Sequence, residues 1–339
     1  MSKVSVVIPN FNHARYLDQR LRSVLSQTYR DFEVVVLDDA STDDSLEVLA
    51  PYRSDPRIRW IENRVNSGSA YKQWNRGVRE ARSDYVWIAE SDDYADERLL
   101  AILVERLERH PRVGVAYCQS WVVDEDGRTL CCAADWVRDL DDGRWRHDFI
   151  ADGRDECARY LLRKNTIHNA SAVVFRRALY EQTGGADESM RLCGDWKVWV
   201  EILLRSDLAF VAEPLNYHRT HPATVRQTAS QEDYARENWR IAARVLSAVD
   251  PPAQIAGAAR ERLASEWVYV TVQRWKRLFE SGRQSFFELK KHDPYFALRS
   301  GRQALRAALA AGRRRLAKAK TRLQSKSRAG GARPRTETR

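Results

Sequence analysis

The sequence predicts an α/β fold in which a mostly parallel sheet carries helices on both faces. Short apolar, β-branched segments alternate with helix-like segments, and these apolar segments are continuous runs rather than alternations of apolar and polar residues. Continuous apolar strands joined by helices are typical of parallel sheets that are covered on both sides. At 339 residues, the chain is long enough for a full enzyme core with an appendage.

The expected elements follow one another in regular order as far as about residue 118. Apolar or β-branched runs predict strands at 3–8, 33–37, 57–62, 85–89 and 113–118. Apolar residues at helical spacing predict helices at about 17–25, 41–52, 70–81 and 96–109. We expect Ser41 to cap the second of these helices.

The remainder of the chain is less regular. Residues 119–168 are polar and irregular, and so long an excursion is typical of a functional flap. A strand at 169–175, a helix at 194–205 and a strand at 208–212 follow, and 232–298 is expected to be helical. The predicted organisation is a main domain over 1–225, a helical appendage over 226–298 and a basic tail over 299–339.

The net charge of +10 lies in the tail. Residues 299–339 hold 14 Lys or Arg and one acid, whereas the rest of the chain holds 43 basic and 46 acidic residues. A folded body without excess positive charge argues against nucleic acid as a partner. A cationic amphipathic helix over 299–323 would fit an anionic membrane surface, with a disordered end beyond it. A solvated extension that binds nothing specific is the alternative.

Cysteine usage and hydropathy bear on location. The five cysteines are scattered and show no paired or metal-ligand spacing, which is typical of reduced thiols in a cytosol. No apolar run approaches the roughly 20 residues that a membrane span needs. We expect a cytoplasmic protein, with the inner face of the cell membrane as a peripheral site if the tail adsorbs there.

Acidic residues crowd the segment that follows the expected strand at 85–89. Glu90, Asp92 and Asp93 stand almost in a row there, and such carboxylates repel one another unless a cation or a hydrogen-bond donor neutralises them. Mg²⁺ and Mn²⁺ take oxygen ligands of this kind, typically one or two carboxylates plus substrate phosphates. Alternatively, Asp92 or Asp93 caps the helix that follows.

A second acidic pair, Asp38 and Asp39, follows the expected strand at 33–37. A carboxylate at this point could accept hydrogen bonds from a base N–H or a ribose hydroxyl, as acids do in dinucleotide-binding sheets. Helix capping is again the alternative. Because ligands bind beyond the carboxyl ends of the strands in such sheets, two neighbouring acidic clusters indicate a crevice for a nucleotide and a metal.

An ordered set of motifs resembles the family-2 glycosyltransferases of the GT-A fold. The motifs lie at 4–12, 21–29, 38–43, 66–68, 75–77, 91–93, 184–185 and 194–196. The resemblance covers roughly the first 225 residues, and it is the ordered set rather than any single motif that is specific. It implies a GT-A-type, Rossmann-like mixed sheet, a catalytic domain over 1–225, a nucleotide-sugar donor, and Mn²⁺ or Mg²⁺ as cofactor.

The resemblance also implies which residues bind the base of the donor. Asp39 would receive the N3–H of a uracil-type base, and Asp38 would lie near it. Pro9 and Phe11 would flank the base on either side. These four residues stand directly after the first two expected strands.

The family's metal and diphosphate site is implied at two further segments. Asp93 would be the direct metal ligand of the DxD motif, and Asp92 would face the ribose or the metal. His221 could complete the metal shell and Arg219 could neutralise phosphate, although His221 could equally be an ordinary loop histidine. Glu90 stands where many relatives carry aspartate, and its share in binding is left open.

Asp195 matches the catalytic base of the family. An inverting transfer needs one carboxylate to take the proton of the acceptor hydroxyl as that oxygen attacks the anomeric carbon, and it needs charge stabilisation on the departing nucleoside diphosphate. Capping of the helix at 194–205 is a second role that Asp195 could combine with catalysis. Trp196 could stack on an acceptor sugar, with core packing as the alternative.

We therefore expect an inverting, metal-dependent glycosyltransferase. It would move a sugar from a UDP- or dTDP-type donor to a hydroxyl of a saccharide or lipid-linked acceptor, in the assembly of cell-surface polysaccharide or glycan. One alternative is a degenerate domain that acts as a membrane or partner adaptor, but the acids named above are intact. The other is a sugar-nucleotide nucleotidyltransferase, which would need a Gly-rich phosphate loop with a basic residue where 9–12 stands.

Overall fold

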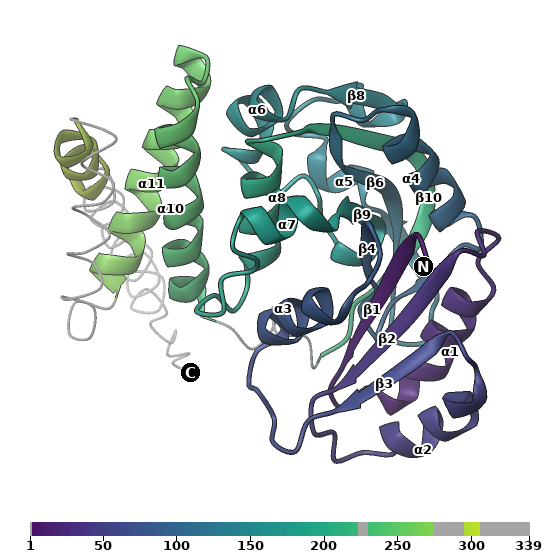
Figure 1. Cartoon of the computed structure of the whole chain (residues 1–339). Coiled ribbons are helices and arrows are strands. Elements are labelled where there is room, and N and C mark those ends of the chain that lie inside the picture. The colour runs from purple at the N-terminus through teal and green to yellow at the C-terminus, as the bar shows by residue number, and fades with distance from the viewer. Residues whose placement is uncertain (1, 223–229, 274–294, 306–339) are drawn as a thin grey trace, which may run out of the picture. The chain divides into compact units, whose positions relative to one another are not determined.

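The computed structural model describes residues 2–222, 230–273 and 295–305. Its centre is a ten-stranded sheet with the strand order β3-β2-β1-β4-β9-β6-β10-β5, in which β7 pairs with β6 and β8 with β10 (Figure 1). The strands are β1 (Val4–Asn10), β2 (Phe32–Asp38), β3 (Ile58–Glu62), β4 (Tyr85–Ile88), β5 (Tyr94–Ala95), β6 (Val113–Val123), β7 (Thr129–Cys132), β8 (Phe149–Ala151), β9 (Val173–Arg176) and β10 (Asp207–Arg219).

The chain also forms helices. They are α1 (Ala14–Leu25), α2 (Ser45–Leu49), α3 (Ala70–Glu80), α4 (Leu99–Arg109), α5 (Ala134–Val137), α6 (Gly153–Glu156), α7 (Arg177–Gln182), α8 (Gly194–Leu203), α10 (Gln231–Ala248) and α11 (Ala253–Gln273). Short helical turns, η1 (Ala50–Ser54), η2 (Arg144–Arg146), η3 (Cys157–Leu161) and η4 (Ala170–Ala172), connect some of them.

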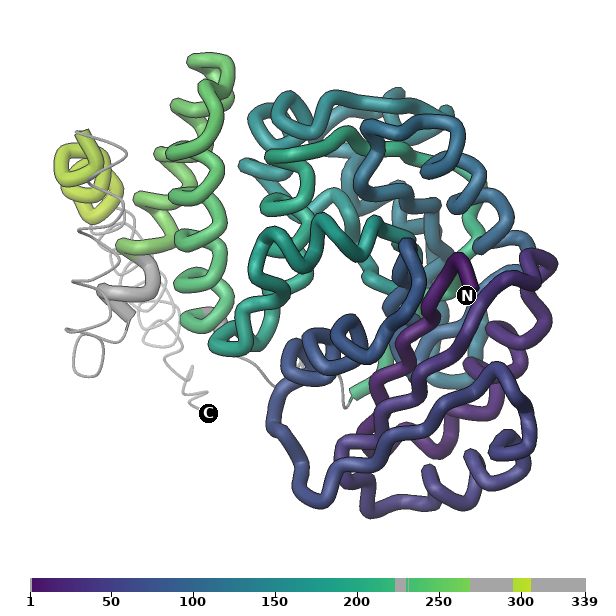
Figure 2. Tube along the Cα trace, viewed as in Figure 1, coloured from purple at the N-terminus to yellow at the C-terminus, as the bar shows by residue number. Residues whose placement is uncertain are grey.

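The strand directions bring most strand ends to one edge. β1 runs parallel to β2 and β4, and β2 runs parallel to β3, so these strands lie side by side in the trace (Figure 2). β9 is antiparallel to both β4 and β6, and β10 is parallel to β6. The carboxyl ends of β1, β2, β4, β6 and β10 therefore share one edge. The predicted mixed, mostly parallel sheet with helices is confirmed.

Several local predictions differ from the structure. The strands expected at 113–118 and 208–212 extend to Val123 and Arg219, because β6 and β10 pair along most of their length. The 119–168 segment is not an irregular flap, since it contributes β7 and β8 to the sheet. Ser41 caps no helix, because α2 begins at Ser45 and the Ser41 hydroxyl donates to Asp38 instead.

Packing of α3 on the sheet depends on one glycine. A Cβ atom at Gly77 would lie 2.2 Å from the Val7 side chain of β1, so no larger residue fits between helix and strand. The same helix buries Tyr71, Trp74 and Val78. Helix α3 is thus held close to β1, and its aromatic residues reach the edge where the strands end.

The predicted boundary at residue 225 differs from the structure. The chain divides into two compact units after Ala256, so α10 belongs to the first unit. Arg244 of α10 donates to both carboxylate oxygens of Glu201 on α8, at 2.7 and 3.0 Å. The composition of the sequence did not predict polar contacts of this kind between α10 and α8.

The second unit begins at Gly257. Its described residues contain the rest of α11 and a helical stretch at 296–305. Glu261 accepts hydrogen bonds from Arg299 and Gln303, and the rings of Trp267 and Phe296 are 6.2 Å apart. The predicted amphipathic helix and disordered end lie outside the described residues beyond residue 305, so the proposed membrane contact of 299–323 stays a prediction.

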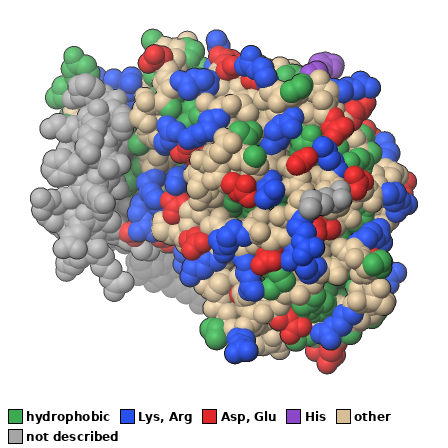
Figure 3. All heavy atoms as spheres, viewed as in Figure 1, with side chains coloured by type: hydrophobic (Ala, Val, Ile, Leu, Met, Phe, Trp, Pro, Cys, Tyr) green, Lys and Arg blue, Asp and Glu red, His purple; other side chains and the backbone are tan. Residues whose placement is uncertain are grey.

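Two surface properties relate to the predicted partners. Within the described ranges, no helix is long and apolar enough to cross a membrane. On the face shown in Figure 3, Lys and Arg side chains are interspersed with Asp and Glu side chains. This mixture agrees with the nearly balanced charge of the body.

Glu156 gives the fold a pH dependence. Its side chain is 1% exposed, and burial raises its pKa to about 7, although Arg144 donates to it at 2.6 Å and opposes that rise. Because the folded state then binds the proton more tightly than the unfolded state, this group lowers the free energy of unfolding by about 3 kcal/mol as the pH rises from 4.5 through 7.

This expectation is checked by urea unfolding of the wild type and Glu156→Gln between pH 5 and 8. As the pH rises, the free energy of unfolding of the wild type should fall relative to that of Glu156→Gln. Other titrating groups are common to both proteins and cancel in the difference. A difference that stays constant over this range would contradict the assigned pKa.

Candidate active site

The shared edge of the sheet gathers four segments of the chain. The loop after β1 carries Phe11 and His13, and the loop after β2 carries Asp39. The loop after β4 carries Asp92, and the segment after β10 carries His221. Residues far apart in the sequence therefore meet where a parallel sheet binds its ligands.

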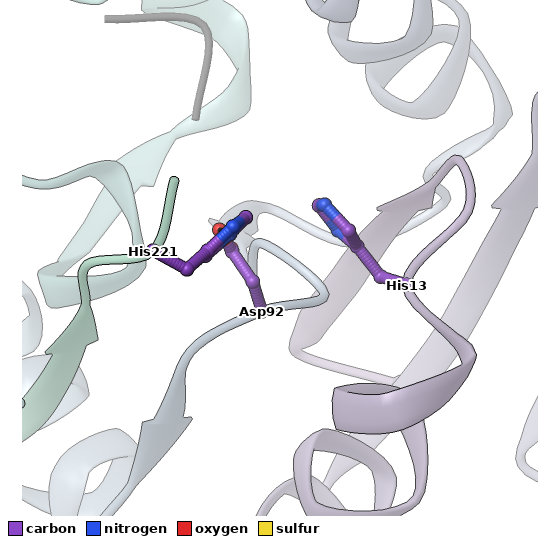
Figure 4. A group of neighbouring side chains, drawn as sticks. All are labelled: His13, Asp92 and His221. Carbon is purple, nitrogen blue, oxygen red and sulfur yellow. Dashed lines mark hydrogen bonds and ion pairs between the residues drawn. The ribbon is translucent and has the colours of Figure 1, made fainter. Parts of the chain in front are cut away.

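His13, Asp92 and His221 form a candidate metal site. One ligand atom from each lies within 4.8 Å of the others, and Figure 4 shows the two imidazoles converging on the carboxylate from separate loops. His221 Nε2 is 3.1 Å from Asp92 Oδ2, and His13 Nδ1 is 2.8 Å from the hydroxyl of Ser91. Two imidazoles and a carboxylate suit a transition metal such as Mn²⁺ better than Mg²⁺, which prefers oxygen ligands.

His13 is not among the site residues predicted from the sequence, because the motif at this point of the chain ends at Asn12. Its position could have indicated a role, because His13 lies directly between β1 and α1 and the other segments of the site also directly follow strands. In the fold, its ring lies 5.6 Å from that of His221 at nearly a right angle. Only this convergence distinguishes His13 from an ordinary loop histidine.

Asp93 lies in a different environment from Asp92. It is 2% exposed, and it accepts hydrogen bonds from Asn169 Nδ2 at 2.9 Å and from the backbone N–H of Arg219 at 2.8 Å. Burial raises the pKa of Asp93, but the contact with His218 and the positive charge of Arg20 lower this pKa by a larger amount, so the net shift is downward. Asp93 thus joins the loop after β4 to β10, whereas Asp92 belongs to the candidate metal site.

The predicted phosphate contact of Arg219 is contradicted by the structure. Its side chain is 2% exposed, and every nitrogen of the guanidinium group donates inside the protein. The acceptors are the backbone oxygens of Asp92, Asp124 and Glu125 and the side chain of Gln19. Arg219 therefore fastens the loop after β4 to a hairpin and to α1, and these contacts use four of its five N–H donors.

Glu90 forms a polar contact with α3 rather than with the residues of the candidate metal site. Its Oε1 accepts the indole N–H of Trp74 at 2.7 Å. Burial, followed by the charge of Asp92, raises the pKa of Glu90 to about 8. Glu90 is therefore mainly protonated at neutral pH, which reduces the repulsion between neighbouring acids.

Asp39 is held by a separate segment of the chain. Its carboxylate accepts hydrogen bonds from Ser67 N and Oγ, from Asn63 Nδ2 and from Gln73 Nε2, at 2.5–2.9 Å. It is 4% exposed, and Oδ2 receives only one of these bonds, so that oxygen keeps an acceptor position. The next residue, Ala40, has a φ of +60°, which costs an L-residue about 1–2 kcal/mol.

The other predicted base-binding residues divide into two kinds. Asp38 is 2% exposed, and Asn10 at the end of β1 and Ser41 in the loop after β2 donate to it. Pro9 is buried within β1. Phe11 is 43% exposed and presents its ring at the same edge. Phe11 is thus available to a ligand, whereas Asp38 and Pro9 support the loops behind it.

Asp195 lies in the first turn of α8 and is half-buried. A Cβ atom at Gly194 would lie 2.5 Å from the ring of Tyr71, and the backbone N–H of Gly194 donates to the Tyr71 hydroxyl. Because Tyr71 and Trp74 are in ring contact and Trp74 binds Glu90, the start of α8 is joined to the loop after β4 through α3.

A second connection joins Asp195 to the metal-site loop. Asn165 donates to Asp195 Oδ2 at 3.1 Å, and Asn169 donates to Asp93. These two asparagines are four positions apart, so their Cα atoms lie within about 14 Å. Both connections therefore tie the start of α8 to the loop that carries Asp92 and Asp93.

Helix capping does not account for these acids. Helix α4 begins at Leu99 with Arg98 at its N-cap, well after Asp92 and Asp93. Helix α8 begins at Gly194 with Cys193 at its N-cap, and no side chain caps it. The alternative of simple caps therefore fails for all three acids.

The loop in front of Asp195 is held from α10. The carboxylate of Glu237 is 1% exposed and accepts the backbone N–H groups of Arg191, Leu192 and Cys193, at 2.7–2.9 Å. Backbone amides that converge on a charged acceptor make strong hydrogen bonds. The sequence offered no signal for this contact, because Glu237 lies in a segment predicted to be an appendage.

We expect Glu237→Gln to loosen this loop, because an amide nitrogen cannot accept from a backbone N–H. Hydrogen exchange of the amides at 191–193 should accelerate, and the free energy of unfolding should fall by about 2 kcal/mol. The matched control is Arg244→Gln, which removes the α10–α8 ion pair and leaves these amides bound. Equal exchange at 191–193 in the two variants would contradict the assignment.

Trp196 does not fit its predicted role. It is 2% exposed, and its indole N–H donates to the backbone oxygen of Leu161. A ring enclosed in this way has no face for a sugar, so the prediction of acceptor stacking is wrong and core packing accounts for the residue.

A comparison of the sequence with known families identifies the chain. The family model described as Glycosyl transferase family 2 matches residues 5–184. The chain belongs to this family. The resemblance noted from the motifs is thereby confirmed.

Two curated relatives show how far this likeness extends. The chain is 32% identical over 112 residues to poly(ribitol-phosphate) beta-N-acetylglucosaminyltransferase TarS of Staphylococcus aureus, which is 32% of this chain and 20% of TarS. It is 23% identical over 259 residues to glycosyltransferase GlyG of Streptococcus pneumoniae, which is 72% of this chain and 79% of GlyG. The match to TarS therefore spans only a fifth of that protein.

Solved structures confirm the GT-A-type fold. TarS residues 1–349 in complex with UDP-GlcNAc superpose with a TM-score of 0.64 at 18% identity and cover 89% of each chain. Mannosyltransferase PcManGT of Pyrobaculum calidifontis, in complex with GDP-Man and Mn²⁺, gives a TM-score of 0.54 at 17% identity and covers 90% of this chain and 87% of its own. At such identity, the likeness concerns the fold.

Proposed function

We propose that this family-2 member is an inverting, metal-dependent glycosyltransferase that uses a nucleotide-sugar donor, with UDP- and dTDP-sugars favoured, and a saccharide or lipid-linked acceptor. The observation that carries the proposal is the meeting of His13, Asp92 and His221 at the edge to which Asp195 is also joined. A role in cell-surface polysaccharide assembly is favoured by the relation to TarS.

The base of the donor would lie against Phe11 and be read by Asp39. The acceptor position left on Asp39 Oδ2 suits the N3–H of uracil or thymine. The surrounding donors from Asn63, Ser67 and Gln73 hold this carboxylate in place.

The divalent cation would be held by His13, Asp92 and His221 together with the diphosphate. When bound, such an ion stabilises the negative charge of a departing nucleoside diphosphate. We therefore assign the ligand role to Asp92 and the histidines, and propose that Asp93 acts by holding Arg219 and Asn169. Asp92 is 19% exposed, which leaves it open to the ion, whereas Asp93 is enclosed.

Asp195 would act on the acceptor. Its carboxylate would take the proton of the acceptor hydroxyl as the oxygen forms a bond to the anomeric carbon and the bond to the diphosphate breaks on the opposite face. Asn165 orients this carboxylate through its amide N–H. The Glu237-bound loop fixes the backbone from which Asp195 projects.

Thermal unfolding with UDP, dTDP, GDP and CDP tests the proposal, each with Mn²⁺, with Mg²⁺ and with EDTA. A ligand at 100 times its Kd should stabilise the fold by about 2.7 kcal/mol. We expect UDP or dTDP with Mn²⁺ to stabilise most, and EDTA to remove most of the effect. If none of the four nucleotides stabilised the protein, the proposed function would be wrong. If the stabilisation were equally large in EDTA, the proposed metal dependence would be wrong.

A further inference from the structure

Trp136 differs from the other tryptophans of the described residues. It is 37% exposed, whereas the indoles of Trp74, Trp87, Trp145 and Trp199 are at most 5% exposed. It lies on α5, in the 119–168 segment, of which the proposed function uses only Asn165. An exposed indole is a large, rigid surface with one polar edge, and such side chains are enriched at binding sites.

The ring is fixed by the segment that follows η3. The indole N–H donates to the backbone oxygen of Asn165 at 2.9 Å, and His168 packs against the indole with ring centroids 5.3 Å apart. Lys164 donates to the backbone oxygen of Trp136 and lies 4.7 Å from the ring centroid. Because these contacts already hold the indole, little side-chain entropy is left to lose when a ligand binds.

The same segment places Trp136 beside the proposed base. Asn165 binds Trp136 through its backbone oxygen and Asp195 through its side-chain amide. Since one residue makes both hydrogen bonds, the indole nitrogen and the Asp195 carboxylate lie within about 11 Å of each other. A ligand on the exposed indole is therefore close enough to present a group to Asp195.

Carbohydrate is the ligand class that fits this arrangement. A sugar ring offers an apolar C–H face to an aromatic ring and hydroxyls around its rim, and the indole is bordered by the polar groups of Lys164, Asn165 and His168. Lys164 is paired with Asp139 at 2.6 Å, so the surroundings of the ring are not strongly cationic. This balance favours a neutral saccharide over an anionic ligand.

We propose that Trp136 is the stacking platform of an acceptor subsite, on which a neutral saccharide lies with one hydroxyl directed at Asp195. The proposal rests on the proposed function, since it assigns the acceptor of that reaction. It gives the 119–168 segment a role in acceptor recognition and takes the place of the contradicted role of Trp196.

The test uses saturation-transfer-difference NMR on the full chain with UDP and Mn²⁺. The probes are the methyl β-glycosides of glucose, galactose and N-acetylglucosamine and their β-linked disaccharides. The variants are Trp136→Ala and Trp136→Phe. The matched control is Leu130→Ala, which shortens an exposed apolar side chain of the same segment.

We expect at least one probe to bind the wild type and Leu130→Ala equally. Trp136→Ala should weaken its binding about tenfold or more. Trp136→Phe keeps an aromatic face and loses the hydrogen bond to Asn165, so it should stay within about threefold of the wild type. The thermal shift with UDP and Mn²⁺ should be the same in all four proteins, which also shows that each is folded.

Three results would overturn the proposal. The first is unchanged saccharide binding in Trp136→Ala. The second is a loss of saccharide binding in Trp136→Phe as large as that in Trp136→Ala, because the effect would then belong to the hydrogen bond with Asn165. The third is that no probe binds to a wild type that binds UDP. Failure of the proposed function has a different signature, because UDP would then stabilise none of the four proteins.

Discussion

Asp92→Asn will abolish the Mn²⁺-dependent part of the stabilisation by UDP and lower donor turnover at least 100-fold. The substitution keeps the size of the side chain and removes the carboxylate that lies 3.1 Å from His221. Loss of a partner that merely orients a ligand typically costs 10–100-fold in metal affinity, so loss of a ligand itself should cost more. Titration of UDP with and without Mn²⁺, together with release of UDP from a UDP-sugar that the wild type turns over, measures both effects.

Asp93→Asn is the matched control for this experiment. An asparagine there would lose the charge that Asn169 and the Arg219 backbone bind, so its main effect should be a lower free energy of unfolding, by about 3 kcal/mol. The folded protein should keep its preference for UDP with Mn²⁺ over UDP with EDTA. Selective loss of that preference in Asp93→Asn, with Asp92→Asn unaffected, would reverse the assignment of the two acids.

Asp195→Asn is expected to spare UDP binding and to lower the release of UDP from a UDP-sugar that the wild type turns over about 10²–10⁴-fold. A positioned general base contributes about this much, and the amide cannot take the proton of the attacking hydroxyl. Asn165 still has an oxygen to which it can donate, so the local structure should persist. Isothermal titration with UDP and Mn²⁺ measures binding, and initial rates of UDP release measure turnover.

Asp142→Asn serves as the control for Asp195→Asn. Asp142 is an exposed acid whose partner is Arg146, so removing its charge should change neither binding nor rate by more than about threefold. If Asp195→Asn lost UDP binding as strongly as turnover, the division between donor and acceptor roles would be wrong. Turnover at the wild-type rate would remove Asp195 from the reaction.

The positions of the strands and of the acidic clusters were predictable from the sequence. Runs such as Val4–Ile8 and Val34–Leu37 are apolar apart from Ser5, which is typical of a strand covered on both faces. The acids that follow β2 and β4 stand at strand ends for the same reason, since parallel strands have their carboxyl ends at one edge. The location of the crevice therefore followed from local patterns alone.

The roles of individual residues at that edge did not follow. Asp92 and Asp93 are neighbours with the same side chain, and Trp196 is as aromatic as Trp136. Their environments separate them, because Asn169 and β10 enclose Asp93 while His221 faces Asp92, and Leu161 receives the indole N–H of Trp196. Arg219 was predicted to bind phosphate from its type and position, but four acceptors on three other segments use its donors.

What the sequence determined by itself was the order of the elements and the edge at which chemistry takes place, because apolar patterning and strand-end polarity act over a few residues. What the tertiary structure decided was which charged and aromatic groups are enclosed and which are open to a ligand. That depends on partners such as Asn169 and Glu237, which lie 76 and 44 positions along the chain from Asp93 and Cys193. A local pattern contains no information about contacts made over such separations.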